Sequence, residues 1–181
     1  MAEGTDTIAA KGLSVQRCVL PRQQLVGLAF AAVLGVCSWP AFAGDTQAPA
    51  FSVKSVDGRA VRFSDYRNRP VIVDFWATWC APCRASMPHL SGMQQRYGKS
   101  GLAVIGLSVD ETGPAPVRRF ANSLGVKFTI AMANDEVLDA YGPIRSIPTT
   151  FFINRKGAIV RRVVGYIDGE TMDGYVQEIL R

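Results

Sequence analysis

The sequence predicts an α/β fold in which a central mixed β-sheet is flanked by helices and an extra β-hairpin lies at the N-terminal end of the domain. Two largely apolar segments, at residues 71–77 and 102–109, are typical of strands that are covered on both faces. A segment with helical signals follows each of them, and the chain ends with two more strands and a last helix. This order favours one mixed sheet between helices.

The hairpin is predicted from alternation. Apolar and polar side chains alternate over residues 51–54 and 60–63, on either side of the turn sequence Asp57-Gly58. We expect this hairpin to enlarge the sheet at one edge. One helical turn is expected at Ser64-Asp65-Tyr66, directly before the first long strand.

The remaining elements follow from helical spacing, prolines and glycines. Leu90, Met93 and Tyr97 share one face of the first long helix, and Pro114 and Gly125 mark the start and the end of the second. Helices are expected at residues 81–97, 114–124, 135–141 and 168–180, and strands at residues 71–77, 102–109, 128–131, 149–154 and 158–164.

The first 43 residues have the pattern of a targeting segment. Arg17 and Arg22 precede the apolar run 25–43, which closes on Ala41-Phe42-Ala43. Small residues at the end of the run suit cleavage by a signal peptidase. The run is also about as long as the shortest membrane spans, so an uncleaved anchor, or tether, through residues 25–43 is the alternative. Residues 1–43 are therefore expected to be a signal peptide or an N-terminal membrane anchor.

Residues 44–181 are expected to form one domain outside the cytoplasm. The chain has 181 residues, of which 48% are hydrophobic, and this is enough for a well-buried core. The net charge of +5 is spread along the chain, which argues against a nucleic-acid footprint. Cleavage after Ala43 would remove Cys18 and Cys37, so that only Cys80 and Cys83 would remain.

These two cysteines lie directly after the first long strand and are separated by Ala81-Pro82. If a helix begins at Cys80, the free N–H groups of its first turn and the positive end of its dipole stabilise a thiolate, which is the nucleophilic form. Cys83, one turn further on, can attack a mixed disulfide on Cys80 and release the partner. Pro82 is compatible with a first helical turn. The pattern therefore indicates a redox-active pair.

The order of elements and several motifs resemble the TlpA/ResA-like family of secreted thioredoxin-fold thiol-disulfide oxidoreductases, which includes the cytochrome c maturation reductases. The resemblance covers about residues 48–181. Its motifs are Ala48-Pro49 with Phe51, Ser64-Asp65-Tyr66, the ten residues from Phe75 to Arg84, and Ile147-Pro148-Thr149-Thr150.

The resemblance implies a substrate-binding surface beside the cysteines. In the family, the proline that matches Pro148 is cis and faces the cysteine pair. The backbone of Ile147 is then expected to pair with an extended substrate strand. Trp79 is expected to shield the pair and to contact substrate.

Asp74 is a candidate acid–base group. It lies inside an otherwise apolar strand, where a carboxylate is costly unless it is protonated or paired. The resemblance implies that it activates Cys83 through a water molecule, and burial is expected to raise its pKa toward neutrality. Thioredoxin's lysine partner falls near Gly106 here, so the usual countercharge is missing. Ser86 departs from the family in the same region, since many members have a glutamate there.

The function that the resemblance implies is a periplasmic thiol-disulfide oxidoreductase that reduces protein disulfides, first of all in cytochrome c biogenesis. A reductant in an oxidising compartment needs a supply of electrons, so a membrane donor of the DsbD/CcdA type is the expected partner. We expect no cofactor other than the Cys80–Cys83 pair, no metal, and a monomer.

Three alternatives remain at this point. The protein could donate disulfides, although Ala81-Pro82 lacks the histidine of strong oxidants between the cysteines. It could deliver copper, although no histidine follows His89 to serve as a third ligand. A peroxidase is the weakest alternative, because the Pro-x-x-x-Thr-x-x-Cys pattern of peroxiredoxins is absent.

Overall fold

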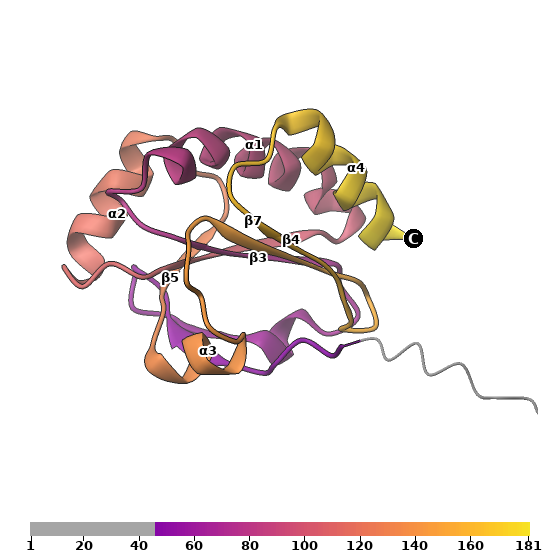
Figure 1. Cartoon of the computed structure of the whole chain (residues 1–181), viewed down its shortest axis with the longest axis horizontal. Coiled ribbons are helices and arrows are strands. Elements are labelled where there is room, and N and C mark those ends of the chain that lie inside the picture. Colours follow the sequence, from indigo (N-terminus) through magenta and orange to yellow (C-terminus); the bar gives the residue numbers. More distant parts are fainter. Residues whose placement is uncertain (1–45) are drawn as a thin grey trace, which may run out of the picture. The chain divides into compact units, whose positions relative to one another are not determined.

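The centre of the fold is a five-stranded mixed sheet with the order β5-β4-β3-β6-β7. Figure 1 shows this sheet in the computed structural model, which describes residues 46–181. Strands β4 and β5 run parallel to β3, whereas β6 runs antiparallel to β3, and β7 antiparallel to β6. The strands are β3 (Val71–Trp76), β4 (Ala103–Ser108), β5 (Thr129–Met132), β6 (Thr149–Ile153) and β7 (Ile159–Val164). The predicted mixed sheet is confirmed.

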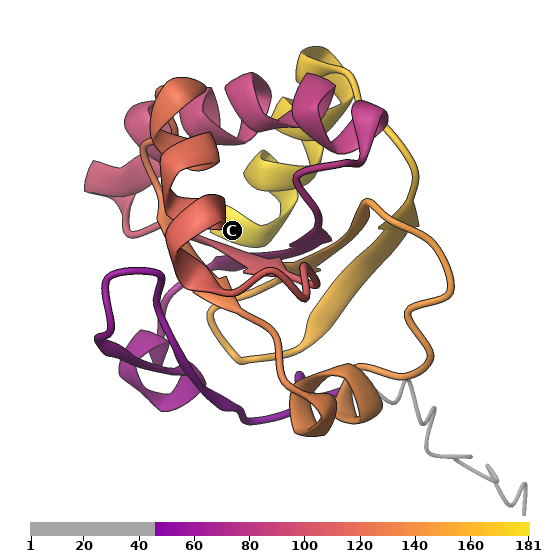
Figure 2. The same ribbon diagram turned by 90° about the vertical axis from the view of Figure 1, so that its left-hand side faces the viewer.

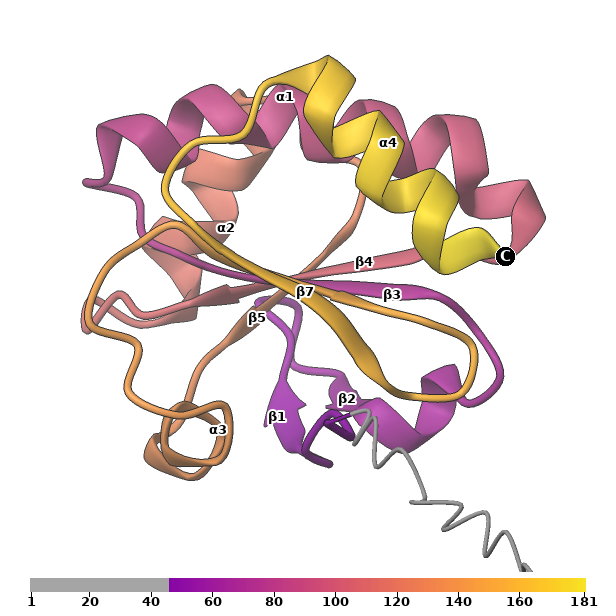
Figure 3. The same cartoon turned by 45° about the vertical axis from the view of Figure 1, so that its right-hand side comes forward.

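Helices cover both faces of this sheet. Figures 2 and 3 show α1, α2 and α4 above the sheet, with α3 and the N-terminal hairpin below it. The helices are α1 (Ala81–Tyr97), α2 (Pro114–Ser123), α3 (Asp135–Ala140) and α4 (Gly169–Leu180), with short 3-10 turns η1 (Phe63–Tyr66) and η2 (Gly98–Ser100). Each predicted helix is present, and the predicted turn before β3 is η1.

The hairpin is present but does not enlarge the main sheet, and this expectation was wrong. Strands β1 (Ser52–Lys54) and β2 (Ala60–Arg62) form a separate two-stranded antiparallel sheet. Its link to β5 is one bridge, Ser55 to Ala131, with the N–H of Val56 donating to the carbonyl of Ile130 at 3.0 Å. Val53 and Val61 instead pack under the sheet in the core, so burial of these side chains places the hairpin.

Strand β3 is buried along its whole length. Because side chains alternate across a strand, Val73 and Phe75 face the hairpin and α3, whereas Ile72 and Trp76 face the helices of the other layer. Asp74 shares the face of Ile72 and Trp76, because it lies two residues from each of them. Its side chain therefore points to the side of α1. The strand therefore aims one carboxyl group at the layer in which α1 begins.

One prediction concerns residues outside the described part of the chain. The expected targeting segment, residues 1–43, lies there together with Cys18 and Cys37. Among the helices of residues 46–181, none combines the length and the apolar character that crossing a bilayer requires.

Gly106 offers a test of the packing between β4 and the helical layer. A Cβ atom on Gly106 would lie 3.0 Å from Nε1 of Trp76 and 2.9 Å from Cδ1 of Ile130. Overpacking of this kind costs about 1–3 kcal/mol, so Gly106→Ala should lower the free energy of unfolding by that amount in urea titrations. Gly174→Ala is the control, because its Cβ meets nothing within 4 Å and a helical alanine should stabilise α4 by up to about 1 kcal/mol. Equal stability of the Gly106 variant and the wild type would contradict the packing described here.

Candidate active site

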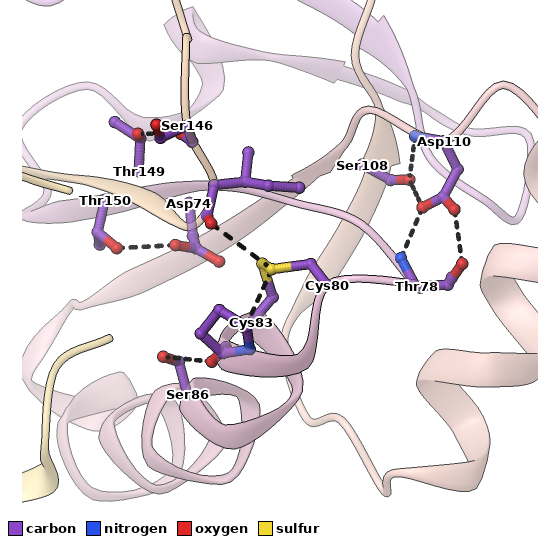
Figure 4. The surroundings of a disulfide bond; sticks show 12 residues. Asp74, Thr78, Cys80, Cys83, Ser86, Ser108, Asp110, Ser146, Thr149 and Thr150 are labelled. Carbon is purple, nitrogen blue, oxygen red and sulfur yellow. Dashed lines mark hydrogen bonds between the residues drawn. A yellow bond between two sulfur atoms is a disulfide. The ribbon is translucent and has the colours of Figure 1, made fainter. Parts of the chain in front are cut away.

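Cys80 and Cys83 form a disulfide at the start of α1, with their Cα atoms 5.2 Å apart. Cys80 is the N-cap of the helix, and the backbone N–H of Cys83 donates to its Sγ at 3.2 Å (Figure 4). Cys80 is 5% exposed and Cys83 only 1%. Cys80 is thus the more exposed residue of the pair.

The start of α1 favours negative charge on Cys80. No acidic residue lies in the first turn of the helix, and Pro82 occupies a position where no N–H is needed. After reduction, the N–H of Cys83 and the helix dipole would both stabilise a thiolate on Cys80. The arrangement is that of an attacking thiol and a resolving thiol.

A loop from the other side of the sheet meets the disulfide. The Ile147–Pro148 peptide bond is cis, as expected, and the carbonyl oxygen of Ile147 lies 3.7 Å from Sγ of Cys80. Trp79, beside Cys80, is 70% exposed, so most of its ring is available to a partner. The carbonyl of Ile147 therefore lies beside Sγ of Cys80, and the exposed ring of Trp79 belongs to the residue directly before Cys80.

Asp74 is fully buried and has one hydrogen-bond donor. The hydroxyl of Thr150, which lies directly opposite Asp74 in β6, donates to its Oδ1 at 2.8 Å. Burial raises the pKa of Asp74 from its ordinary value of 3.8 to about 7, and the bond from Thr150 opposes this rise. Figure 4 shows the carboxyl group between Thr150 and the cysteine pair. A carboxyl group in this place can exchange a proton near neutral pH.

Gly106 lies opposite Asp74 in β4, as expected. The indole of Trp76 fills the space beside Gly106, since a Cβ there would touch its Nε1. A lysine at this position would have no room. The position of the thioredoxin countercharge is therefore filled by neighbouring side chains, and Asp74 is met instead by the hydroxyl of Thr150.

A second buried carboxylate lies at the same end of the sheet and was not among the predicted site residues. Asp110 follows β4 and is 6% exposed. It accepts hydrogen bonds from the backbone N–H of Thr78 at 2.9 Å, from the hydroxyl of Thr78 at 2.6 Å and from the hydroxyl of Ser108 at 2.7 Å. One signal could have found it: polar residues directly after two neighbouring parallel strands meet at one edge of the sheet.

Two other polar residues singled out in the sequence have hydrogen-bond partners away from the cysteines. The hydroxyl of Ser86 donates to the carbonyl of Pro82 within α1, at 3.2 Å. A ring nitrogen of His89 lies 3.1 Å from the hydroxyl of Tyr166. Within residues 46–181, no three His, Cys, Asp or Glu side chains come together in a way that could hold a metal ion.

The fold and the disulfide at the start of α1 define the class: the protein is a thioredoxin-fold thiol-disulfide oxidoreductase. Comparisons with known proteins give the family. A model of the AhpC/TSA family matches residues 45–162, and the chain belongs to this family.

Its relatives include thiol-disulfide oxidoreductases named ResA. The chain is 33% identical over 134 residues to ResA of Bacillus thuringiensis (strain Al Hakam), covering 74% of this chain and 76% of the relative. It is 34% identical over 140 residues to ResA of Geobacillus thermodenitrificans (strain NG80-2), with 77% and 79% covered.

The solved structures agree with this assignment. A thiol:disulfide interchange protein of the thioredoxin family, from Chlorobium tepidum TLS, matches with a TM-score of 0.73 and 31% identity. The match covers 78% of this chain and 100% of that one. The oxidoreductase is thus of the ResA type, with Cys80 and Cys83 as its disulfide.

The raised pKa of Asp74 predicts a pH-dependent stability. Between about pH 4 and pH 7 the folded state holds a proton that the unfolded state has released, so the free energy of unfolding should fall as the pH rises. A pKa raised from 3.8 to about 7 corresponds to about 4 kcal/mol. Asp74→Asn removes the titrating carboxyl group, and with it this pH dependence, but keeps an acceptor for Thr150. Urea unfolding of the oxidised proteins should show the variant gaining about 4 kcal/mol on the wild type between pH 4 and pH 8, and parallel curves would count against a raised pKa.

The hydrogen bond from Thr150 predicts a further shift. Thr150→Val keeps the shape of the side chain and removes the donor, so the pKa of Asp74 should rise above its wild-type value. Titration of the Asp74 carboxyl carbon by NMR measures this directly. Thr149→Val is the matched control, because the hydroxyl of Thr149 donates to the carbonyl of Ser146 instead. If both variants shift the pKa equally, the bond from Thr150 is not the cause.

Proposed function

We propose that this protein reduces disulfides in partner proteins in the periplasm, with Cys80 as the nucleophile and Cys83 as the resolving thiol. The observation that carries the proposal is the bond from the Cys83 N–H to Sγ of Cys80 at the helix start. This donor favours the thiolate on the more exposed of the two sulfurs.

The reaction has two exchange steps. The Cys80 thiolate attacks one sulfur of the substrate disulfide, forms a mixed disulfide and releases the other substrate sulfur as a thiolate. Cys83 loses its proton and attacks Sγ of Cys80, which releases the second substrate sulfur. Two electrons pass to the substrate, and the protein is left with the Cys80–Cys83 disulfide seen in the structure.

Asp74 is proposed to accept the proton of Cys83 in the second step. Its carboxyl group is buried on the side of α1, and its pKa of about 7 is close to the pH at which the reaction would take place. A general base is most effective when its pKa lies near the operating pH. Water would carry the proton between the two groups, in agreement with the resemblance to thioredoxins.

The substrate is proposed to bind across the loop before β6. The carbonyl of Ile147 lies beside Cys80 and can pair with the backbone of an extended peptide. Pro148 follows Ile147 through the cis bond, and the exposed ring of Trp79 supplies apolar contact area. These groups suit a protein segment with an exposed disulfide.

The direction of electron flow is proposed from the residues between the cysteines. Ala81 and Pro82 offer no group that stabilises the reduced form further, which favours a reductant over a strong oxidant. The TlpA/ResA-like resemblance supports apocytochrome c as the substrate, with a membrane donor of the DsbD/CcdA type restoring the dithiol. The targeting pattern of residues 1–43 supports the periplasmic location.

The equilibrium reduction potential tests the direction. Titration against glutathione, with tryptophan fluorescence as the signal, should give a value of about −270 to −200 mV, the range of thioredoxin and the glutaredoxins. A value near about −120 mV, as in strong oxidants, would make the protein a disulfide donor. If the titration shows no cooperative redox transition, copper binding becomes the favoured function.

Trapping tests the two thiol roles in the same protein. Cys83→Ser should accumulate mixed disulfides through Cys80, because the resolving thiol is gone. Cys80→Ser is the control and should accumulate few, since Cys83 is the less exposed sulfur. Equal trapping by both variants would contradict the assigned roles. Mass spectrometry of the trapped partners identifies the substrates.

A further inference from the structure

The turn between β3 and α1 is held to the neighbouring strand by a single buried carboxylate. Residues 77–80 form this turn, which the N–H of Cys80 closes by donating to the carbonyl of Ala77 at 3.2 Å. Asp110, at the end of β4, accepts both the backbone N–H and the hydroxyl of Thr78. The turn that carries Trp79 and Cys80 is thus fastened at Thr78.

The parallel pairing of β3 and β4 brings Asp110 next to this turn. The N–H of Val109 donates to the carbonyl of Trp76 at 2.9 Å, so the ladder continues to the last residue of β3. Ser108 then orients Asp110 twice, with its hydroxyl donating to Oδ2 and accepting the N–H of Asp110 at 3.1 Å. The carboxylate therefore projects from a rigid strand end toward the turn.

A buried carboxylate is costly unless donors surround it, and hydrogen bonds to a charged group are about twice as strong as neutral ones. Three donors from two residues meet this requirement at Asp110. Two of the three donors belong to Thr78, so the hydrogen bonds that stabilise the carboxylate also restrain the turn. The restraint is therefore strong and specific to one residue of the turn.

The redox state decides when this restraint matters. In the oxidised protein the disulfide itself holds Sγ of Cys80 beside the N–H of Cys83. After reduction that covalent link is gone, and the position of Cys80 depends on the turn. The hydrogen bonds to Thr78 do not involve either sulfur, so they can persist in both states.

We propose that Asp110 is a positioning residue that, through Thr78, keeps the reduced Cys80 at the helix start, where the Cys83 N–H stabilises its thiolate. The proposal rests on the proposed function only in taking Cys80 as the attacking thiol. Asp110 touches neither the sulfur nor the substrate; it acts on the turn that carries them.

The charge of Asp110 and its positioning role have opposite effects on Cys80. A nearby negative charge disfavours a thiolate, so removing the charge alone would lower the pKa of Cys80. Loss of the restraint would raise this pKa, because the thiolate would lose its N–H donor part of the time. The direction of the change therefore separates the two effects.

The test measures how fast iodoacetamide alkylates Cys80 in the reduced protein as a function of pH, with mass spectrometry to assign the modified cysteine. Asp110→Ala should raise the pKa of Cys80 and slow its alkylation at pH 7 by about fivefold, the equivalent of one hydrogen bond. Asp110→Asn keeps an acceptor for the N–H of Thr78 and a partner for its hydroxyl but removes the charge, so it should lower the pKa of Cys80 and should not slow its alkylation.

Two further variants complete the comparison. Thr78→Val keeps the backbone bond to Asp110 and loses the hydroxyl, so it should slow alkylation by about twofold; it also carries the test if Asp110→Ala fails to fold. Asp168→Ala is the control for stability alone. Asp168 accepts from the N–H and the hydroxyl of Thr171 at the start of α4, the same pair of bonds away from the turn.

The outcomes are distinct. Slower alkylation in Asp110→Ala and Thr78→Val, with Asp168→Ala unchanged, supports the proposal. Unchanged or faster alkylation in Asp110→Ala, with Cys80 reactive in the wild type, overturns it and leaves the proposed function intact. Preferential alkylation of Cys83 in the wild type overturns the assignment of Cys80 as nucleophile, and this proposal with it.

Discussion

The position of Cys80 at the N-cap of α1 is the constraint on which the rest of the site depends. A central strand buried on both faces leads into a four-residue turn, and the helix begins directly after it. The strand can support this because its side chains pack into the cores on both faces of the sheet. The sulfur thereby lies at a helix start, where it accepts the backbone N–H of Cys83.

Two buried carboxyl groups at this end of the sheet differ in their surroundings and so in what they can do. Asp74 has one donor, Thr150, and burial dominates, so its pKa is raised to the range in which it can take up and release a proton. Asp110 has three hydrogen-bond donors, and two of them belong to Thr78 in the turn before α1. Environment, rather than residue type, separates a proton carrier from a structural acceptor.

Local patterns were enough to predict most of the fold. Alternation, helical spacing and glycine or proline signals place every strand and helix within about two residues of its observed bounds. The burial of Asp74 and the cis bond before Pro148 also agree with expectation. These features depend on short segments or on a family motif.

The features that sequence reasoning missed depend on register between distant strands. Thr150 meets Asp74 across 76 residues, and Asp110 meets Thr78 across 32, through pairings that no local pattern specifies. The separate sheet of the hairpin was missed for a related reason. Alternation predicts the two strands. Whether they continue the main sheet depends on the tertiary contacts of Val53 and Val61, which pack in the core under the sheet.

The first residues of the described chain contact both outer strands of the main sheet. The carbonyl of Thr46 accepts the N–H of Ile159 at the start of β7, and Ser55 bridges to Ala131 in β5. Open strand edges are templates on which a second chain can add itself. One short segment therefore covers part of each edge, and proteolytic trimming of it would open both edges to edge-to-edge aggregation.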